Sequence, residues 1–408
     1  MRAVAICLPL LGGIYSVFLT MRRGLAPHGV QVTWLAAGKT ADDVVRSAGT
    51  PEDAASGRVI APEATGELEL ANAYVEHLVA RADVVVINLL GGTVEPNLAR
   101  YLPPHIFRVL IVHTTTLATY RAARAIRDWV HVTVGVAPRI VRDLVEEWGF
   151  DPACTRLIPN AIPAAGFPAL PKSPNLDRPL RILSHGRMDH SSKGVRWIPE
   201  ILDRTRKAGV RFTATISGDG PDAPALRREI ARRHLADAVR FTGWTPREQV
   251  PGLMASQDVF LFPSIYEGFG ITLAEAMAAG CVPVASRIHG VTDWLVDHGR
   301  SGLLFPIGDT RAATMHLLQL DRDRGMLTQL AAQARAAALA RFTEDAQGTA
   351  YRQLFREVIA SPRPIAAPLS LSEWSLPRGL RPAWWHRLPE PVKDALRMAR
   401  ERTHAARA

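Results

Sequence analysis

Short apolar runs rich in β-branched residues alternate with stretches of helical character along most of this chain. In the first half these runs lie at residues 4–8, 30–35, 83–88, 108–113, 130–134 and 156–160. Strands that alternate with helices pair in parallel, and a parallel sheet needs helices on both of its faces. The pattern therefore predicts doubly wound α/β sheets, and ligand-binding residues are expected at the carboxyl ends of their strands.

The length of 408 residues is sufficient for more than one such domain. A segment at 163–179 is rich in proline and alanine and lacks periodicity, and a predicted strand begins after it. We predict the following organisation: a Rossmann-like domain at 1–165, a linker at 166–179, a second Rossmann-like domain at 180–345, and carboxyl-terminal helices with a basic tail at 346–408.

Composition narrows the class of protein further. Hydrophobic residues make up 47% of the chain and charged residues 22%, as is ordinary for a soluble globular enzyme. The three cysteines, Cys7, Cys154 and Cys281, are far apart and form no C-x-x-C pair. The sequence thus indicates neither a disulfide framework nor a zinc site, and it favours a reducing, cytoplasmic location.

Residues 3–21 carry no charge, so a secretory signal has to be considered there. Pro9 and the pair Gly12-Gly13 interrupt the apolar run. We therefore interpret the segment as a strand, a Gly-Gly turn and a helix at 15–25, which form a βαβ unit with the strand at 30–35.

A glycine-rich acidic turn joins the predicted strand at 258–262 to a helix that begins near Gly270. Glu267 lies in the turn, and Glu275 lies in the first or second turn of the helix. Two glycines flank Phe269, where the backbone must approach something closely, and the N–H groups past Gly270 form an anion site that suits a diphosphate. The simpler interpretation of an acid at this place is a helix cap.

The spacing E-x7-E from Glu267 to Glu275 resembles the signature of retaining glycosyltransferases of the GT-B fold, in family 4. The likeness continues through a strand at 280–286 and a strand edge at 302–305. It implies two Rossmann-like domains that face each other across a cleft, an acceptor domain first and a nucleotide-sugar donor domain second. It also implies that Glu275 binds the donor ribose, that Glu267 contacts the donor sugar, and that backbone amides of Phe269, Gly270 and Ile271 hold sugar and phosphate.

A second cluster follows the predicted strand at 180–187, which ends in Gly186-Arg187, with Ser192-Lys193-Gly194 at the start of a helix. Arg187 can bind phosphate oxygens in a bidentate manner and Lys193 supplies a point charge, so both could neutralise a leaving diphosphate. The resemblance to the family pattern G-R-x(n)-K-G favours this role. The alternative is that both are solvated loop residues.

The resemblance extends to three more places in the chain. His113 ends a predicted strand and matches a histidine that the family often has near the donor sugar, although a structural hydrogen-bonding role is the alternative. Trp244 and Thr245 lie in a turn that often contacts the nucleobase in relatives, and a packing role for this tryptophan is equally open. The Gly12-Gly13 turn approaches the donor phosphates and the acceptor in the family, or is simply a tight turn.

No metal or other cofactor is expected beside the donor, a UDP-, GDP- or ADP-sugar. The triplet Asp321-Arg322-Asp323 copies the metal-binding D-x-D of the other glycosyltransferase fold, but it does not follow a strand. Its neighbours Arg324 and Gly325 indicate a solvated turn between helices.

The carboxyl-terminal tail is strongly basic. From Arg378 onward eight Lys and Arg residues stand against three acidic residues, which accounts for half of the net charge of +10. Residues 391–408 can form a basic helix, and Trp384 and Trp385 precede it, so the tail suits the surface of an anionic membrane. A solvated or domain-capping tail is the alternative, and nucleic-acid binding is disfavoured because no reader motif is present.

These observations predict a retaining glycosyltransferase that transfers a sugar to a hydroxyl acceptor, a saccharide or a lipid-linked molecule, in cell-surface polysaccharide or glycolipid assembly. Two other classes stay open. One is a sugar-nucleotide epimerase or a phosphorylase on the same scaffold, since a fold does not decide the reaction. The other is a non-catalytic sugar-nucleotide-binding subunit.

Overall fold

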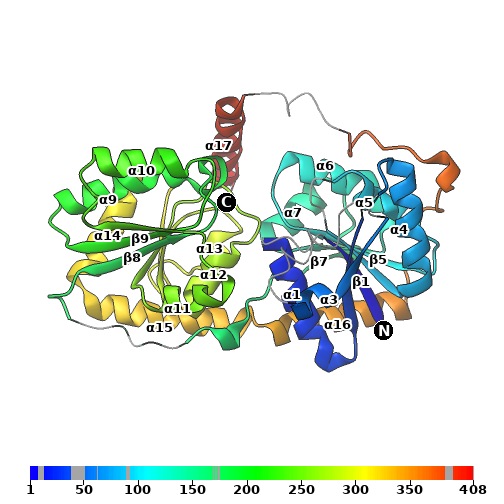
Figure 1. Cartoon of the computed structure of the whole chain (residues 1–408), viewed down its shortest axis with the longest axis horizontal. Coiled ribbons are helices and arrows are strands. Elements are labelled where there is room, and N and C mark those ends of the chain that lie inside the picture. Colours follow the sequence, from blue (N-terminus) through cyan, green and yellow to red (C-terminus); the bar gives the residue numbers. More distant parts are fainter. Residues whose placement is uncertain are drawn as a thin grey trace. The chain divides into compact units, whose positions relative to one another are not determined.

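A computed structural model of the chain describes residues 1–7, 13–37, 51–61, 63–88, 92–168, 170, 172, 175–381 and 389–407 (Figure 1). It separates into two compact units. Unit 1 comprises Met1–Ala161 with Glu344–His386, and unit 2 comprises Ile162–Thr343 with Arg387–Ala408. The expected linker thus belongs to unit 2, and the carboxyl-terminal tail, expected as one part, is divided between the units.

Unit 1 contains a parallel sheet of seven strands in the order β3-β2-β1-β4-β5-β6-β7. The strands are β1 (Arg2–Ile6), β2 (Gln31–Ala37), β3 (Gly57–Ile60), β4 (Val84–Asn88), β5 (Phe107–Val112), β6 (Val132–Gly135) and β7 (Thr155–Leu157). Its helices are α1 (Gly13–Leu25), α3 (Pro51–Ala55), α4 (Glu67–Arg81), α5 (Val94–Asn97), α6 (Leu117–Ile126), α7 (Pro138–Glu146) and α16 (Glu344–Ala360). Strand β4 is buried along its whole length, because helices cover both faces of the sheet.

Helix α16 packs against α1 through two glycines. A Cβ atom on Gly348 would lie 1.9 Å from the carbonyl oxygen of Gly24, and one on Gly24 would lie 2.1 Å from that of Glu344. Only glycine at both positions allows the two backbones to approach so closely. This contact attaches α16, which follows unit 2 in the sequence, to the first helix of unit 1.

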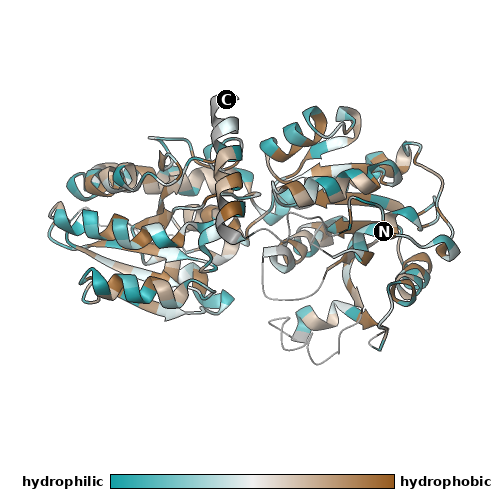
Figure 2. Cartoon of the chain, turned by 90° about the horizontal axis from the view of Figure 1, so that it is seen from above, coloured by the Kyte–Doolittle hydropathy of each residue, from teal (hydrophilic) through white to brown (hydrophobic). Residues whose placement is uncertain are grey.

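Unit 2 contains a parallel sheet of six strands in the order β10-β9-β8-β11-β12-β13. The strands are β8 (Leu180–His185), β9 (Phe212–Ser217), β10 (Val239–Gly243), β11 (Val259–Phe262), β12 (Val282–Ser286) and β13 (Leu303–Phe305). The helices are α8 (His190–Lys193), α9 (Ile198–Lys207), α10 (Ala223–Arg232), α11 (Val250–Ala255), α12 (Ile271–Ala278), α13 (Thr292–Leu295), α14 (Thr310–Arg322), α15 (Arg324–Arg341) and α17 (Glu390–Arg407). In both units the strands are largely hydrophobic and many helices turn hydrophilic residues outward (Figure 2).

The predicted fold class, two doubly wound parallel-sheet domains, is confirmed. Every strand predicted above is present within a few residues of its expected limits, and the sheet order is the same in unit 2 as in the first six strands of unit 1. Strand β3 was not predicted, since Gly57 and Arg58 make half of this short edge strand unlike a β-branched run.

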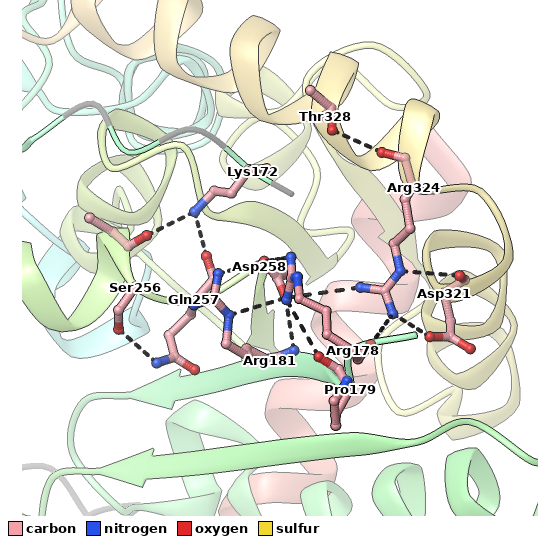
Figure 3. A network of polar contacts seen from close by, with 11 residues as sticks. Lys172, Arg178, Pro179, Arg181, Ser256, Gln257, Asp258, Asp321, Arg324 and Thr328 are labelled. Carbon is pink, nitrogen blue, oxygen red and sulfur yellow. Dashed lines mark hydrogen bonds and ion pairs between the residues drawn. The ribbon is translucent and has the colours of Figure 1, made fainter. Parts of the chain in front are cut away.

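A buried polar network fixes the beginning of unit 2 (Figure 3). Asp258, directly before β11, is fully buried and accepts hydrogen bonds from Arg178 at 2.6 and 2.8 Å and from the backbone N–H of Arg181 at 2.9 Å. Burial alone would raise the pKa of Asp258, but these hydrogen bonds outweigh it and hold the pKa below its usual value. Lys172 donates to the carbonyl oxygens of Ala255 and Gln257. The segment before β8 is thereby attached to unit 2.

The proline-bearing stretch at 361–381 belongs to unit 1 and has little regular structure apart from a short 3-10 helix at Leu371–Glu373. The hydroxyl of Tyr101 accepts a hydrogen bond of 2.9 Å from the N–H of Ser375, and the ring centroid of Trp374 lies 4.7 Å from that of Tyr101. Arg100 donates to the carbonyl oxygen of Ser375 at 2.8 Å. Among the helices in the described ranges, none is both long enough and apolar enough to span a bilayer.

Candidate functional site

The turn from β11 to α12 is almost wholly buried. Within residues 261–270 only Tyr266 retains substantial exposure. Gly270 adopts a φ of +95° and forms the N-cap of α12, which is a conformation that favours glycine. The helix packs through Leu273, Ala276 and Met277, as predicted, and its first N–H groups have no partner within the helix itself.

Two motifs that are 74 residues apart in the sequence meet at Glu267. Its Oε1 atom accepts a hydrogen bond of 2.6 Å from Lys193 Nζ and one of 2.8 Å from the hydroxyl of Ser264. The buried carboxylate is therefore held by one charged and one neutral donor. Ser264 was not singled out from the sequence, because its contact with Glu267 depends on the shape of the turn.

Backbone contacts on both sides of Lys193 explain why its side chain reaches Glu267. The N–H of Ile265 donates to the carbonyl oxygen of Ser192 at 2.8 Å. Gly194 has a φ of +62°, and a Cβ atom there would lie 2.0 Å from the carbonyl oxygen of Pro263. The Ser-Lys-Gly segment and the acidic turn are consequently in direct backbone contact.

Arg187 follows β8 at Gly186, whose φ is +137°. Its side chain is 70% exposed, and its Nε atom lies 4.0 Å from an oxygen of Asp189. Asp189 itself caps α8, since its side chain accepts from the N–H of Ser191. The guanidinium is therefore held only loosely, whereas Lys193 is fixed by Glu267.

Glu275 lies in the middle of α12 and is only partly exposed. Burial raises the pKa of its carboxyl group to about 7, against which the charge of Arg247 acts weakly. A carboxyl group with such a pKa is a common feature of functional sites. The position thus matches the one expected from the sequence, and its ionisation near pH 7 was not foreseen.

A chain of hydrogen bonds that the sequence did not predict connects β8, β9 and the turn after β10. His185 Nδ1 and Ser217 Oγ are 2.9 Å apart, and Ser217 Oγ and Thr245 Oγ1 are 2.7 Å apart. Burial lowers the pKa of His185 to about 4, so its ring is neutral near pH 7. Trp244 is 59% exposed, which excludes a role in core packing.

Phe269 contributes differently from its neighbours. Its ring is buried and packs edge-on against Trp294 and Phe342, with centroid distances of 6.3 and 5.3 Å. The guanidinium of Arg341 lies over both of those partner rings. Only the backbone of Phe269 is left for contact with a ligand. Ile271, two residues on, is partly exposed at the start of α12.

In unit 1, His113 directly follows β5 and is buried. Its Nε2 atom lies 2.8 Å from Asn88 Oδ1 at the end of β4, and we assign Nε2 as the donor because this oxygen can only accept. Burial lowers the pKa of His113 to about 4. Gly13 is the first residue of α1 and is exposed, whereas Gly12 lies outside the described residues.

Asp321 and Arg322 are the last two residues of α14, and Asp323 separates this helix from α15. The triplet thus lies at the predicted helix junction, but the prediction of a solvated turn is wrong for its neighbour Arg324, which is buried. Asp321 pairs with Arg324 at 2.5 Å, and Asp323 caps α15 by accepting from the N–H of Met326. Both carboxylates thus serve the helix junction. Within the described ranges, no group of three or more His, Cys, Asp or Glu side chains is arranged to hold a metal ion.

Comparison with protein-family models matches residues 179–323 to the family described as Glycosyl transferases group 1. The match covers just over a third of the chain and lies within unit 2. The family resemblance stated from the E-x7-E spacing is thus confirmed for the group 1 domain, which forms most of unit 2 and contains the Glu267–Lys193 pair.

Curated relatives match a similar part of the chain. The amylovoran biosynthesis glycosyltransferase AmsK of Erwinia amylovora is 35% identical over 185 residues, 44% of each chain. The putative colanic acid biosynthesis glycosyltransferase WcaL of Escherichia coli K12 is 36% identical over 154 residues, 36% of this chain and 37% of its own. The alignments therefore span less than half of the length of these relatives.

Solved structures extend the likeness to nearly the whole chain. Sucrose-phosphate synthase from Thermosynechococcus elongatus has a TM-score of 0.74 at 19% identity, covering 88% of this chain and 100% of its own. HepE of Anabaena, solved in complex with UDP and glucose, has a TM-score of 0.71 at 18% identity over the same shares. At such identities the likeness concerns the fold, which is the GT-B fold of two Rossmann-like domains.

Proposed function

We propose that the chain is a retaining glycosyltransferase that moves a sugar from a nucleoside diphosphate sugar to a hydroxyl acceptor. The observation that carries this proposal is the position of the Glu267–Lys193 pair, 2.6 Å apart, directly before the N-terminus of α12 within a group 1 domain. Glu275, farther along the same helix, adds a carboxyl group whose proton is lost near pH 7.

Sugar transfer of this kind requires groups that stabilise the charges of the transition state more than it requires a strong base. As the bond between the anomeric carbon and the donor phosphate oxygen breaks, negative charge grows on the diphosphate and positive charge on the sugar. Lys193, Arg187 and the N–H groups of α12 would stabilise the diphosphate, and Glu267 would lie near the sugar. The acceptor oxygen bonds to the same face of that carbon, and the leaving phosphate oxygen takes the acceptor proton.

Donor recognition is proposed for residues of the same unit. An ionised Glu275 accepts hydrogen bonds, which suits the ribose hydroxyls. Trp244 exposes a ring that can stack on a nucleobase, and Thr245 beside it is already part of a hydrogen-bond chain. The remaining donor contacts are backbone atoms of Gly186, Phe269, Gly270 and Ile271.

Unit 1 would supply the acceptor side. His113 directly follows β5, at a strand end where such folds bind ligands, and would lie near the donor sugar. The Gly12-Gly13 turn would approach the donor phosphates and the acceptor. AmsK and WcaL are named for amylovoran and colanic acid biosynthesis, so a saccharide or lipid-linked acceptor in cell-surface polysaccharide assembly is proposed here.

The tail adds a proposed contact with the inner face of a membrane. Val392 and Leu396 on α17 are 44% and 57% exposed, and the tail from Arg378 carries half of the net charge. Apolar side chains on a basic helix suit an anionic lipid surface. The enzyme would then work in the cytoplasm next to a membrane-bound acceptor.

The first test is thermal stabilisation of the protein by UDP, GDP, ADP and their sugars. We expect one nucleotide to raise the melting temperature of the wild type, and Glu275→Ala and Arg187→Ala to abolish that shift. Glu229→Gln, which changes a surface carboxylate paired with Arg232 and Arg233, is the matched control. An unshifted wild type with every nucleotide would contradict the proposal.

Glu267→Gln separates a transferase from a non-catalytic binder. A transferase should keep nucleotide binding but lose sugar transfer and the release of nucleoside diphosphate. A binder would release none in the wild type either. An epimerase would instead convert the nucleotide sugar to an isomer without releasing the nucleotide.

A further inference from the structure

Helix α17, the last helix that the structure describes, belongs to unit 2 (Figure 1). It contacts the acidic turn through a side chain. The guanidinium carbon of Arg397 lies 5.4 Å from the ring centroid of Tyr266, within the range of a cation–π interaction. Tyr266 directly precedes Glu267. The last helix of the chain therefore touches the turn that we propose to hold the donor.

Charged residues contribute to the inward side of α17. Of the side chains that the structure describes there, Glu401 is buried and Arg397 is half-buried beside Met398, whereas Val392 and Leu396 are exposed. A helix held only by apolar burial would turn its whole apolar stripe inward. Charged contacts thus help to set the position of α17, and such contacts are specific in geometry.

Tyr266 is the place where this contact can act on the turn. It is the residue of 261–270 that keeps substantial exposure, while both of its neighbours are buried. Its N–H and that of Ile265 point to the carbonyl oxygen of Ser192, at 3.4 and 2.8 Å. A side chain that holds the Tyr266 ring therefore bears on the backbone that joins Glu267 to the Lys193 segment.

We infer that α17 is a positioning element of the donor site, with Arg397 holding Tyr266 and so fixing Glu267 where it pairs with Lys193. The inference rests on the proposed function. Arg397 acts through Tyr266 and does not contact the donor itself. Loss of the contact lets the turn rearrange and displaces Lys193, which we propose to face the diphosphate, so nucleotide binding weakens by about five- to thirtyfold, the range that follows from a partly desolvated cation–π pair.

The test is a double-mutant cycle in the full chain, read by titration calorimetry with UDP, GDP and ADP. We expect Arg397→Ala and Tyr266→Leu each to raise the dissociation constant of the nucleotide that the wild type binds. The double variant should be no weaker than the poorer single variant, since both remove one interaction. Arg397→Lys and Tyr266→Phe keep a cation and a ring, so they should restore most of the affinity.

Leu396→Ala is the matched control, because it changes the exposed face of the same helix, and it should leave affinity unchanged. Unaltered melting temperatures of all variants show that the fold is intact. A wild type that binds no nucleotide contradicts the proposed function. Nucleotide binding that Arg397→Ala or Tyr266→Leu leaves intact, or additive losses in the double variant, would overturn the positioning role while the proposed function stands.

Discussion

At the scale of single residues, the ionisation of Glu275 makes the stability of the fold depend on pH, and nucleotide binding is expected to depend on pH in the same range. Burial raises its pKa from an ordinary 4.5 to about 7 in the folded chain. Between these two values the folded state keeps a proton that the unfolded state has lost, so this group lowers stability as the pH rises. Above about pH 7 the penalty is complete and amounts to a few kcal/mol at most.

Glu275→Gln removes that penalty, because the amide has no charge to bury. We expect the variant to melt at the same temperature as the wild type near pH 4.5 and several degrees higher at pH 8, measured by calorimetry across this range. The wild type should also bind nucleotide more tightly as the pH rises through 7, whereas the variant should show no such dependence. A variant that is less stable than the wild type at pH 8 would contradict the claim that burial of the ionised Glu275 side chain lowers stability.

The pair of Lys193 and Glu267 predicts a different response. Lys193→Met leaves the buried carboxylate with Ser264 as its neutral donor, and an uncompensated buried charge costs about 2 kcal/mol or more. Adding Glu267→Gln should recover most of that loss, as measured by urea denaturation. Lys207→Met is the control, since Lys207 is exposed and its partner Asp203 keeps Arg233. Equal losses at both lysines would argue against a special role for the Glu267 pair.

At the scale of elements, the contact between α1 and α16 depends on two glycines. Gly348→Ala would place a Cβ atom 1.9 Å from the carbonyl oxygen of Gly24, so the helices must separate, and a loss of about 2 kcal/mol or more is expected. Gly252→Ala in α11 meets nothing within 4 Å and should stabilise the protein by about 0.5–1 kcal/mol. Urea denaturation compares the two, and a tolerated Gly348→Ala would contradict the close packing.

The elements also show what sequence could and could not predict. The strands followed from β-branched runs, and the start of α12 followed from Gly270, because both signals are local. The pairing of Lys193 with Glu267 spans 74 residues and depends on how the two turns touch, so the sequence predicted both residues but not their bond. The hydrogen bonds that join His185, Ser217 and Thr245 could not be predicted, since single polar residues at the ends of two strands and in a turn form no periodic pattern.

At the scale of the whole molecule, the tail departs most from expectation. Its extended stretch at 361–381 binds unit 1 through particular hydrogen bonds and rings such as Trp374 on Tyr101, which composition does not reveal. Its last helix was predicted correctly as a helix, but its inward charged face was not. The basic charge that suggested a membrane surface thus serves unit 2 in part, through Arg397, and the apolar side chains of Val392 and Leu396 are exposed.

That orientation makes the proposed membrane contact testable. The apolar side chains of Val392 and Leu396 would enter the interface, and the net positive charge of the tail would favour anionic lipid. We expect the protein to sediment with vesicles of phosphatidylglycerol and phosphatidylcholine, less at high salt, and not with vesicles of phosphatidylcholine alone. Leu396→Asp combined with Val392→Asp should weaken sedimentation severalfold.

Leu176→Asp is the control for added charge, since Leu176 is an equally exposed leucine of unit 2 outside the tail. Nucleotide affinity should stay unchanged in all of these variants, because the altered side chains are exposed and none is proposed to contact the donor. If Leu176→Asp weakened sedimentation as much as the α17 changes, total charge would explain the binding. In that case α17 would serve the donor turn alone.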